Sequence, residues 1–192
     1  MTRATIKRAT TLAADVTGKF SRYVFEVERF EGGHREVVWD VMERGHSVGV
    51  LGHDPVRDEV VLIREFRPGA AVAGDAPFFE SLIAGTIDGD ESAVTVAIRE
   101  MREEAGLVLS EPVVIHPGAY VSAGSTSEKV AIVAGRVDTR TAGGIHGKPQ
   151  EDENIKTVVV PADEFIRRVR DGEVRDMKTL LAGYWLAEHR GR

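Results

Sequence analysis

Alternation of apolar and polar residues dominates the first half of the chain and predicts β-strands there. From Lys19 to Phe30 the two classes nearly alternate, as in a strand with one buried face. A turn at Glu31–Gly33 separates this stretch from a second one, HREVVWDVMERG, so together they predict a hairpin. Two further strands, SVGVLGHD and EVVLIREFR, are joined by a turn signal at Asp54–Pro55.

Helical spacing appears in the middle of the chain and again at its end. Between Asp90 and Ala105, apolar residues recur at intervals of three and four, which predicts a helix. Pro161 is expected to open a second helix, because proline suits the first turn. A last helix is expected from about Met177 to the C-terminus, and further strands at Val113–Val121, Val130–Val137 and Ile155–Val160. This order of elements predicts a mixed α+β fold.

The Gly-rich, polar segment Thr141–Asn154 predicts a long mobile loop. Loops of this length inside a compact domain are usually functional or disordered. We therefore treat its acidic run, QEDEN, as candidate chemistry.

Composition excludes several classes of function. The chain has 192 residues, enough for one domain with a small appendage, and its formal charge of -6 argues against a nucleic-acid surface. It has no cysteine, which excludes disulfides, thiolate zinc sites and a cysteine nucleophile. No apolar run approaches a membrane span or a secretory signal, so a cytoplasmic protein without a membrane partner is expected.

Three carboxylates crowd one face of the predicted central helix. Glu100 and Glu104 stand four residues apart with Glu103 beside them, a spacing that destabilises an isolated helix. They also lie near the helix C-terminus, the end that disfavours anions. A solvated acidic face balanced by Arg99 and Arg102 is the plain alternative. A divalent cation is the functional one, since Mg²⁺ prefers oxygen ligands.

The full spacing from Gly85 to Leu107 favours the functional alternative. Gly85, five residues, Glu91, seven residues, then REMREEAGL resembles the Nudix box at every specified position. In this box Gly85 allows a close backbone approach, and Gly106 can adopt the left-handed conformation that ends the helix. Arg99 is expected to hold a neighbouring glutamate in its metal-binding orientation.

The segments outside the box resemble the ADP-ribose pyrophosphatase branch of the Nudix family. The resemblance runs through MERGHSVGVLGHD, EFRPGA, LIAGTID, SAGSTSE and GGIHGKPQEDENI. It implies an α/β/α sandwich around a mixed β-sheet at residues 47–192, preceded by an N-terminal β arm at residues 1–46. In that branch the arm is exchanged between the subunits of a homodimer. A hairpin that simply extends the domain's own sheet is the alternative.

The resemblance also implies the metal site. Glu100, Glu104 and the backbone carbonyl of Ala84 are expected to bind Mg²⁺, two or three ions per site, with Mn²⁺ as a substitute. Glu103 is expected close to the ions, in a catalytic role, as a ligand or through water. In the acidic loop, Glu151 aligns with the catalytic base and Glu153 with a further metal ligand. The choice between these two stays open, and Asp152 replaces them if the alignment slips by one residue.

Substrate contacts are implied at five positions: Arg44, Arg67, Thr86, Ser122 and Glu128. For the two arginines the alternative is an ordinary strand-end or edge-strand charge. For Ser122 and Glu128 it is a purely structural turn. The six histidines show no metal-ligand spacing and are interpreted as structural or exposed.

Two positions depart from the branch pattern. Ser81 stands where the branch usually has a glutamate, with Glu80 one residue earlier. Trp39–Asp40 stands where the arm often carries an Arg–Glu pair, which leaves the nucleobase open.

The implied activity is Mg²⁺-dependent hydrolysis of a nucleoside diphosphate sugar, with ADP-ribose yielding AMP and ribose 5-phosphate. GDP-mannose is the main rival, because GEVRDMKTLL resembles the GDP-sugar branch. A binding-only sensor is disfavoured by the intact carboxylates of the box. An isomerase of the same fold is disfavoured by the absence of cysteine.

Overall fold

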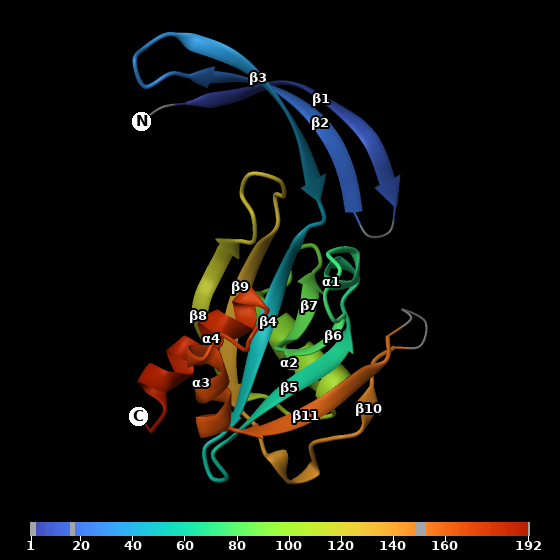
Figure 1. The fold of residues 1–192 in the computed structure, drawn as a ribbon, viewed down its shortest axis with the longest axis vertical. Coiled ribbons are helices and arrows are strands. Elements are labelled where there is room, and N and C mark those ends of the chain that lie inside the picture. Colours follow the sequence, from blue (N-terminus) through green and yellow to red (C-terminus); the bar gives the residue numbers. More distant parts are fainter. Residues whose placement is uncertain (1–2, 16–17, 149–152, 192) are drawn as a thin grey trace. The chain divides into compact units, whose positions relative to one another are not determined.

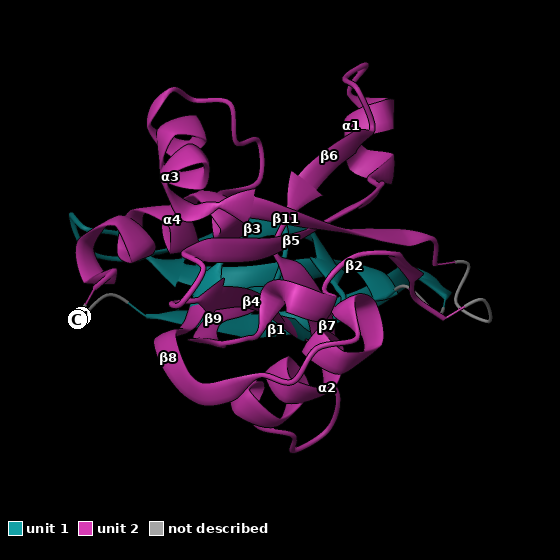
Figure 2. Cartoon of the chain, turned by 90° about the horizontal axis from the view of Figure 1, so that it is seen from below, with its two compact units in different colours: residues 1–46, 119–129 teal, residues 47–118, 130–192 magenta. Residues whose placement is uncertain are grey.

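The computed structural model describes residues 3–15, 18–148 and 153–191 and divides the chain into two compact units. The first unit contains residues 1–46 and 119–129, and the second contains residues 47–118 and 130–192 (Figures 1 and 2). None of the helices among the described residues is long and apolar enough to cross a membrane.

The first unit is built on a three-stranded antiparallel sheet of order β1-β2-β3. The predicted hairpin is present as β2 (Gly18–Glu28) and β3 (His34–Glu43), which pair in register from Lys19–Glu43 to Glu28–His34. Strand β1 (Ala4–Asp15) adds to β2 and was not anticipated. All of its residues are exposed, and a strand without a buried face shows no alternation from which to predict it.

The second unit contains an eight-stranded mixed sheet. Its main path is β10-β11-β5-β4-β9-β8, with β6 beside β5 and β7 beside β4. The strands are β4 (His46–Asp54), β5 (Glu59–Phe66), β6 (Phe78–Ser81), β7 (Ile83–Ile87), β8 (Ser110–Tyr120), β9 (Lys129–Arg136), β10 (Ile145–His146) and β11 (Ile155–Pro161). Strands β4 and β9 are parallel, whereas β5 is antiparallel to both β4 and β11.

Helices cover both faces of this sheet, which confirms the predicted α/β/α sandwich (Figure 2). On one face, Val61 and Ile63 of β5 pack in a core with Met101 of α2 (Ala93–Ala105). On the other, Val60 and Leu62 pack against α3 (Ala162–Arg170) and α4 (Met177–His189). Successive residues of β5 therefore serve opposite layers, as the two-residue period of a strand requires.

The predicted helices and strands of the second half are present with small changes at their ends. Helix α2 begins three residues later than Asp90, because the Ser92 side chain accepts the N–H of Thr95 and caps it. Pro161 is the residue just before α3 rather than its first residue. The short helix α1 (Pro68–Val72) and strands β6 and β7 were not anticipated.

The Gly-rich segment is more regular than its composition suggests. A 3-10 turn covers Thr139–Thr141, and the two residues of β10 pair with β11. The expectation of a segment without strands was therefore wrong for Ile145–His146. Residues 149–152 of the segment lie outside the described residues.

Candidate active site

Helix α2 carries the acidic residues of the box, and its C-terminus is fixed by two contacts. Gly106 adopts a left-handed conformation, with φ of 68°, and its N–H donates to the carbonyl of Arg102. The Thr157 hydroxyl of β11 donates to the backbone carbonyl of Glu104 at 3.0 Å. The last turn of α2 is thereby anchored to the sheet, which satisfies a carbonyl that the helix leaves unpaired.

Glu104 is a buried carboxylate, 4% exposed. The N–H of Ala84 in β7 donates to its Oε2 at 3.1 Å. Burial, together with the charges of Glu65, Glu100 and Glu153, raises the pKa of Glu104 to about 8, against the opposing hydrogen bond from Ala84. Ala84, predicted as a ligand through its carbonyl, thus lies directly beside the carboxylate with which it is expected to bind metal.

Glu100 lies against Gly85 at the centre of the box. A Cβ atom at Gly85 would lie 1.9 Å from Glu100 Oε1, so no larger residue fits while this carboxylate keeps its place. Glu100 is 8% exposed, and burial raises its pKa although Arg99 opposes the shift. The glycine of the box is therefore required by the carboxylate that approaches it.

Arg99 contacts three carboxylates of the box, those of Glu91, Glu100 and Glu103. Its Nη1 lies 2.7 Å from Glu100 Oε1 and 3.2 Å from Glu103 Oε2. Its Nη2 lies 3.8 Å from Glu91 and donates to the backbone carbonyl of Thr86 at 3.4 Å. Arg99 thus joins Glu91 at the start of the box to the carboxylates of α2, and the side chain of Thr86 is exposed.

Glu103 differs from its neighbours on α2 because two cationic side chains contact it. Lys148 Nζ lies 3.0 Å from Glu103 Oε2, the same oxygen that Arg99 contacts. Burial raises the pKa of Glu103, but Lys148 and Arg99 outweigh it and the net shift is downward. Glu103 is therefore an ionised carboxylate whose charge is balanced by Lys148 and Arg99. Its neighbour Glu104 has a raised pKa instead.

Glu153 joins the same group from the Gly-rich segment. The backbone N–H of Lys148 donates to Glu153 Oε2 at 2.9 Å, and the N–H of Glu153 donates to the carbonyl of Lys148. The charge of Glu153 acts on Glu100 and Glu104, so the structure brings this predicted ligand to α2. Glu151 and Asp152 lie outside the described residues.

Arg67 is anchored beside the carboxylates at the end of β5. Its Nη1 lies 2.6 Å from Glu65, and its Nη2 donates to the Ser81 hydroxyl at 2.5 Å. Burial raises the pKa of Glu65, and Glu153 adds to the shift. Sequence reasoning missed Glu65, although its position two residues before Arg67, on the same side of a strand, was a usable signal.

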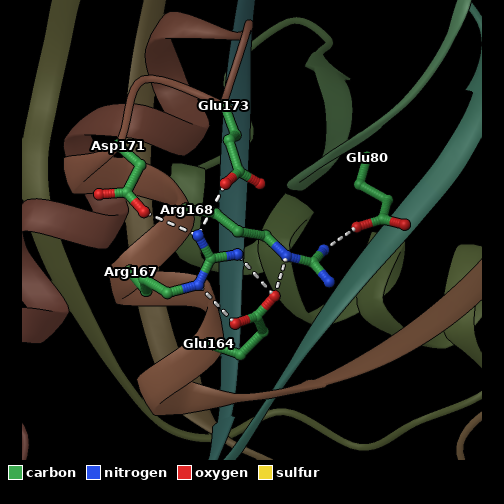
Figure 3. A network of polar contacts seen from close by, with 6 residues as sticks. All are labelled: Glu80, Glu164, Arg167, Arg168, Asp171 and Glu173. Atoms are coloured by element: carbon green, nitrogen blue, oxygen red, sulfur yellow. Dashed lines mark hydrogen bonds and ion pairs between the residues drawn. The ribbon is translucent and has the colours of Figure 1, made fainter.

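The glutamate next to Ser81 does not serve this site. Glu80 of β6 lies 2.7 Å from Arg168 Nη1, within a network on α3 that includes Arg167 and Glu164 (Figure 3). Ser81 itself is fully buried and accepts the Arg67 hydrogen bond. The departure at this position thus replaces a carboxylate by a hydroxyl that holds Arg67.

A cavity of about 720 Å³ opens beside the carboxylates. Glu65 and Glu153 line it, together with the aromatic rings of Phe66 and Phe78, whose centroids are 5.7 Å apart. Arg64, Asn154 and Lys156 complete the lining. The cavity therefore combines acidic, basic and aromatic groups.

The remaining predicted substrate contacts lie in the first unit. Arg44 Nε is 3.7 Å from Glu128 Oε2. Ser122 accepts the backbone N–H groups of Ser125 and Thr126, which makes it part of a turn. The structure therefore brings Arg44 and Glu128 together and has Ser122 at the start of a turn.

The donor set fits a divalent cation completed by other ligands. Among the described residues, no three carboxylates or histidines are grouped closely enough to enclose a metal ion. Mg²⁺ does not need such a cage, because it usually keeps several waters and takes one or two carboxylates plus substrate phosphates. Buried Glu104 and Glu100, with raised pKa values and a glycine cradle, have oxygen donors of the kind that such a cation takes.

Comparisons with known proteins agree with this geometry. An ADP-ribose pyrophosphatase of Escherichia coli (strain K12) is 39% identical over 170 residues, which cover 87% of this chain and 80% of that protein. A GDP-mannose pyrophosphatase of Pectobacterium atrosepticum is 28% identical, covering 83% and 82%. A crystal structure described as an ADP compounds hydrolase has a TM-score of 0.70, covers 98% of this chain and 97% of that chain, and is 22% identical.

The family model described as NUDIX domain matches residues 43–182, a span that contains the whole carboxylate site of α2. The box spacing, the sandwich around a mixed sheet and the 39% identity to a bacterial relative all point the same way. The chain belongs to the Nudix family of hydrolases.

Proposed function

We propose that this protein hydrolyses the diphosphate of ADP-ribose to AMP and ribose 5-phosphate, in a reaction that depends on Mg²⁺. The observation that carries the proposal is the pair of buried carboxylates, Glu100 and Glu104, held against Gly85 and Ala84. The identity of 39% to an ADP-ribose pyrophosphatase supports the choice of substrate.

Glu100, Glu104, the carbonyl of Ala84 and Glu153 are the groups proposed to hold two or three Mg²⁺ ions, for which Mn²⁺ can substitute. When bound, the metal polarises the diphosphate and the attacking water and neutralises developing charge. Glu103 contributes its charge beside the ions. Arg99 keeps Glu100 and Glu103 in place throughout, because it contacts both carboxylates directly.

Hydrolysis needs a base for the attacking water. Glu151, or Glu153 in its place, is proposed to accept the water proton while the oxygen bonds to one phosphorus. The P–O bond of the anhydride then breaks, and its electron pair leaves with the departing phosphate. Arg67, which Glu65 and Ser81 hold, is proposed to orient a phosphate oxygen.

A homodimer is proposed to complete the site, with the N-terminal arm exchanged between subunits. In this arrangement Arg44, Ser122 and Glu128 contact the substrate bound at the partner's carboxylates, and Thr86 contacts it within the same subunit. Apolar side chains exposed on the strands of the arm, including Ile6, Val38 and Trp39, support a surface that a partner covers. No nucleic-acid partner is proposed for a chain of net charge -6.

GDP-mannose is the second candidate substrate. Relatives named GDP-mannose pyrophosphatase cover most of this chain at 28% to 32% identity, against 39% for the ADP-ribose enzyme. The same metal chemistry would serve both substrates, so the difference lies in recognition of the base and sugar.

The test is product analysis with Mg²⁺ on ADP-ribose, GDP-mannose, ADP-glucose and NADH. Glu104→Gln is compared with wild type and with Glu80→Gln, a matched control that removes a carboxylate bound to Arg168 instead. We expect AMP and ribose 5-phosphate from ADP-ribose, abolished in Glu104→Gln and retained in Glu80→Gln. Preferential cleavage of GDP-mannose would refute the substrate, and full activity in Glu104→Gln would refute the site.

A further inference from the structure

Lys148 contacts two carboxylates of the site through two different groups. Its ammonium nitrogen lies 3.0 Å from Glu103 Oε2, and its backbone N–H donates to Glu153 Oε2 at 2.9 Å. One residue therefore joins the catalytic helix to the segment that carries Glu153. The ion pair is partly exposed, since the side chains of Lys148 and Glu103 keep 38% and 30% of their accessible surface.

The residue before Lys148 permits this arrangement. Gly147 has a φ of +99°, a conformation that side chains rarely adopt. A Cβ atom there would lie 2.7 Å from the Cβ of Glu153. Glycine at this position therefore allows Glu153 to approach the backbone of Lys148 closely enough to accept its N–H.

The consequence is an unequal distribution of cations among the carboxylates. Glu103 is contacted by both Lys148 and Arg99, whereas the hydrogen bond of Glu104 comes from the backbone N–H of Ala84. A divalent cation that approaches the site meets Glu104 as a buried carboxylate and Glu103 as one half of an existing ion pair. It must displace or share the ammonium group in order to use Glu103.

We propose that Lys148 is a positioning residue that keeps Glu103 neutralised while its backbone holds Glu153. Its ammonium group competes with the divalent cation for Glu103, and the Gly147–Lys148 step delivers Glu153 to the metal. The inference rests on the proposed function, because the cation concerned is the one assigned to Glu100 and Glu104.

The two halves of the proposal have opposite effects on metal affinity. Lys148→Gln removes the competing charge but keeps the backbone N–H, so it should tighten Mn²⁺ binding. Exposed ion pairs are weak, which places the gain at about two- to fivefold. Gly147→Ala keeps the lysine but disturbs Glu153, so it should weaken Mn²⁺ binding.

The experiment is titration of the full-length protein with Mn²⁺ alone, with free Mn²⁺ followed by electron paramagnetic resonance. Lys156→Gln is the matched control, because Lys156 lines the cavity beside Glu153 and carries the same charge. Lys148→Arg should restore wild-type affinity. Thermal unfolding of each variant establishes that it is folded.

Equal or weaker Mn²⁺ binding by folded Lys148→Gln would overturn the proposal, as would an equal gain in Lys156→Gln. Unchanged Mn²⁺ binding by Gly147→Ala would contradict the role assigned to the backbone N–H of Lys148. ADP-ribose hydrolysis by wild type is measured in parallel. An active wild type with unaltered metal binding in the variants defeats this inference alone, whereas an inactive wild type defeats the proposed function.

Discussion

Adjacent residues of α2 have opposite ionisation behaviour. Glu103 and Glu104 follow one another in the chain, yet the pKa of Glu103 is lowered and that of Glu104 is raised to about 8. Both lose solvation, but only Glu103 has Lys148 and Arg99 to compensate. Side chains one position apart point to different sides of a helix, so their surroundings need not be alike.

In the metal-free protein, the free energy of unfolding should fall as the pH rises because of Glu104. Its pKa is 4.5 for the free side chain and about 8 in the folded protein. The folded state binds this proton more tightly, so the stabilisation is complete below about pH 4.5 and is lost as the pH rises through about 8. Glu104→Gln should lose less stability than wild type between about pH 5 and pH 9, by an amount on the order of a few kcal/mol.

Urea denaturation in the presence of a chelator measures this difference. Added Mg²⁺ should stabilise wild type more at the upper end of the range, because the metal needs the deprotonated carboxylate. Identical pH slopes for wild type and Glu104→Gln would contradict the assignment.

Gly85→Ala should lower kcat by about a hundredfold or more, since small misplacements of catalytic groups have effects of this size. The new methyl group would occupy the position of the Glu100 carboxylate. Gly69→Ala in α1 is the control, because a Cβ there has no atom within 4 Å. The value of kcat is measured for both variants by steady-state kinetics. A Gly85→Ala enzyme with normal kcat would show that Glu100 is dispensable or moves freely.

At the scale of elements, the site depends on how α2 ends. Its left-handed cap at Gly106 packs under His146 of β10, and Thr157 of β11 binds the Glu104 carbonyl. Two strands far along the chain thus contact the last turn, which carries Glu103 and Glu104. This contact gives the Gly-rich segment a structural role in addition to its acidic residues.

Gly106→Ala and Gly172→Ala form a matched pair that separates backbone strain from this contact. Both glycines have positive φ, 68° and 76°, so each substitution should destabilise the protein by about 1–2 kcal/mol. A Cβ at Gly106 would lie 3.0 Å from His146, whereas Gly172 has open space. Only Gly106→Ala is expected to reduce kcat/KM as well, and equal kinetics in the two variants would argue against coupling between β10 and the site.

Sequence patterning recovered α2, β4 and β5, whose apolar residues pack in the core, and missed β1 and α1, which have no buried residue. Helix α2 and strands β4 and β5 have apolar residues at the spacing of their secondary structure, because they pack in the core. Strand β1 is fully exposed, and β6 is only four residues long, so neither carries a readable pattern. Helix α1 was missed for the same reason, because it has no buried residue.

At the scale of the whole molecule, the proposed dimer makes a prediction about mixed subunits. Arg44→Ala and Glu104→Gln should each be nearly inactive as homodimers if both residues serve one composite site. Mixing the two after unfolding and refolding should then restore roughly a quarter of wild-type activity, because half of the dimers are mixed and each has one intact site. Light scattering establishes the oligomeric state, and a monomer or an absence of restored activity would reject the exchange.

The sequence by itself determined the family, the acidic helix and the order of the main elements. These are local properties, since the box spacing and the apolar periodicity can each be recognised within a single segment of the chain. Only the tertiary structure decided which of the other charged residues belong to the site. Glu65 and Lys148 are brought to it by the arrangement of strands and the segment before β11, while Glu80 is directed to α3. It also decided the ionisation of neighbouring glutamates, because burial and ion pairing depend on residues distant in the chain.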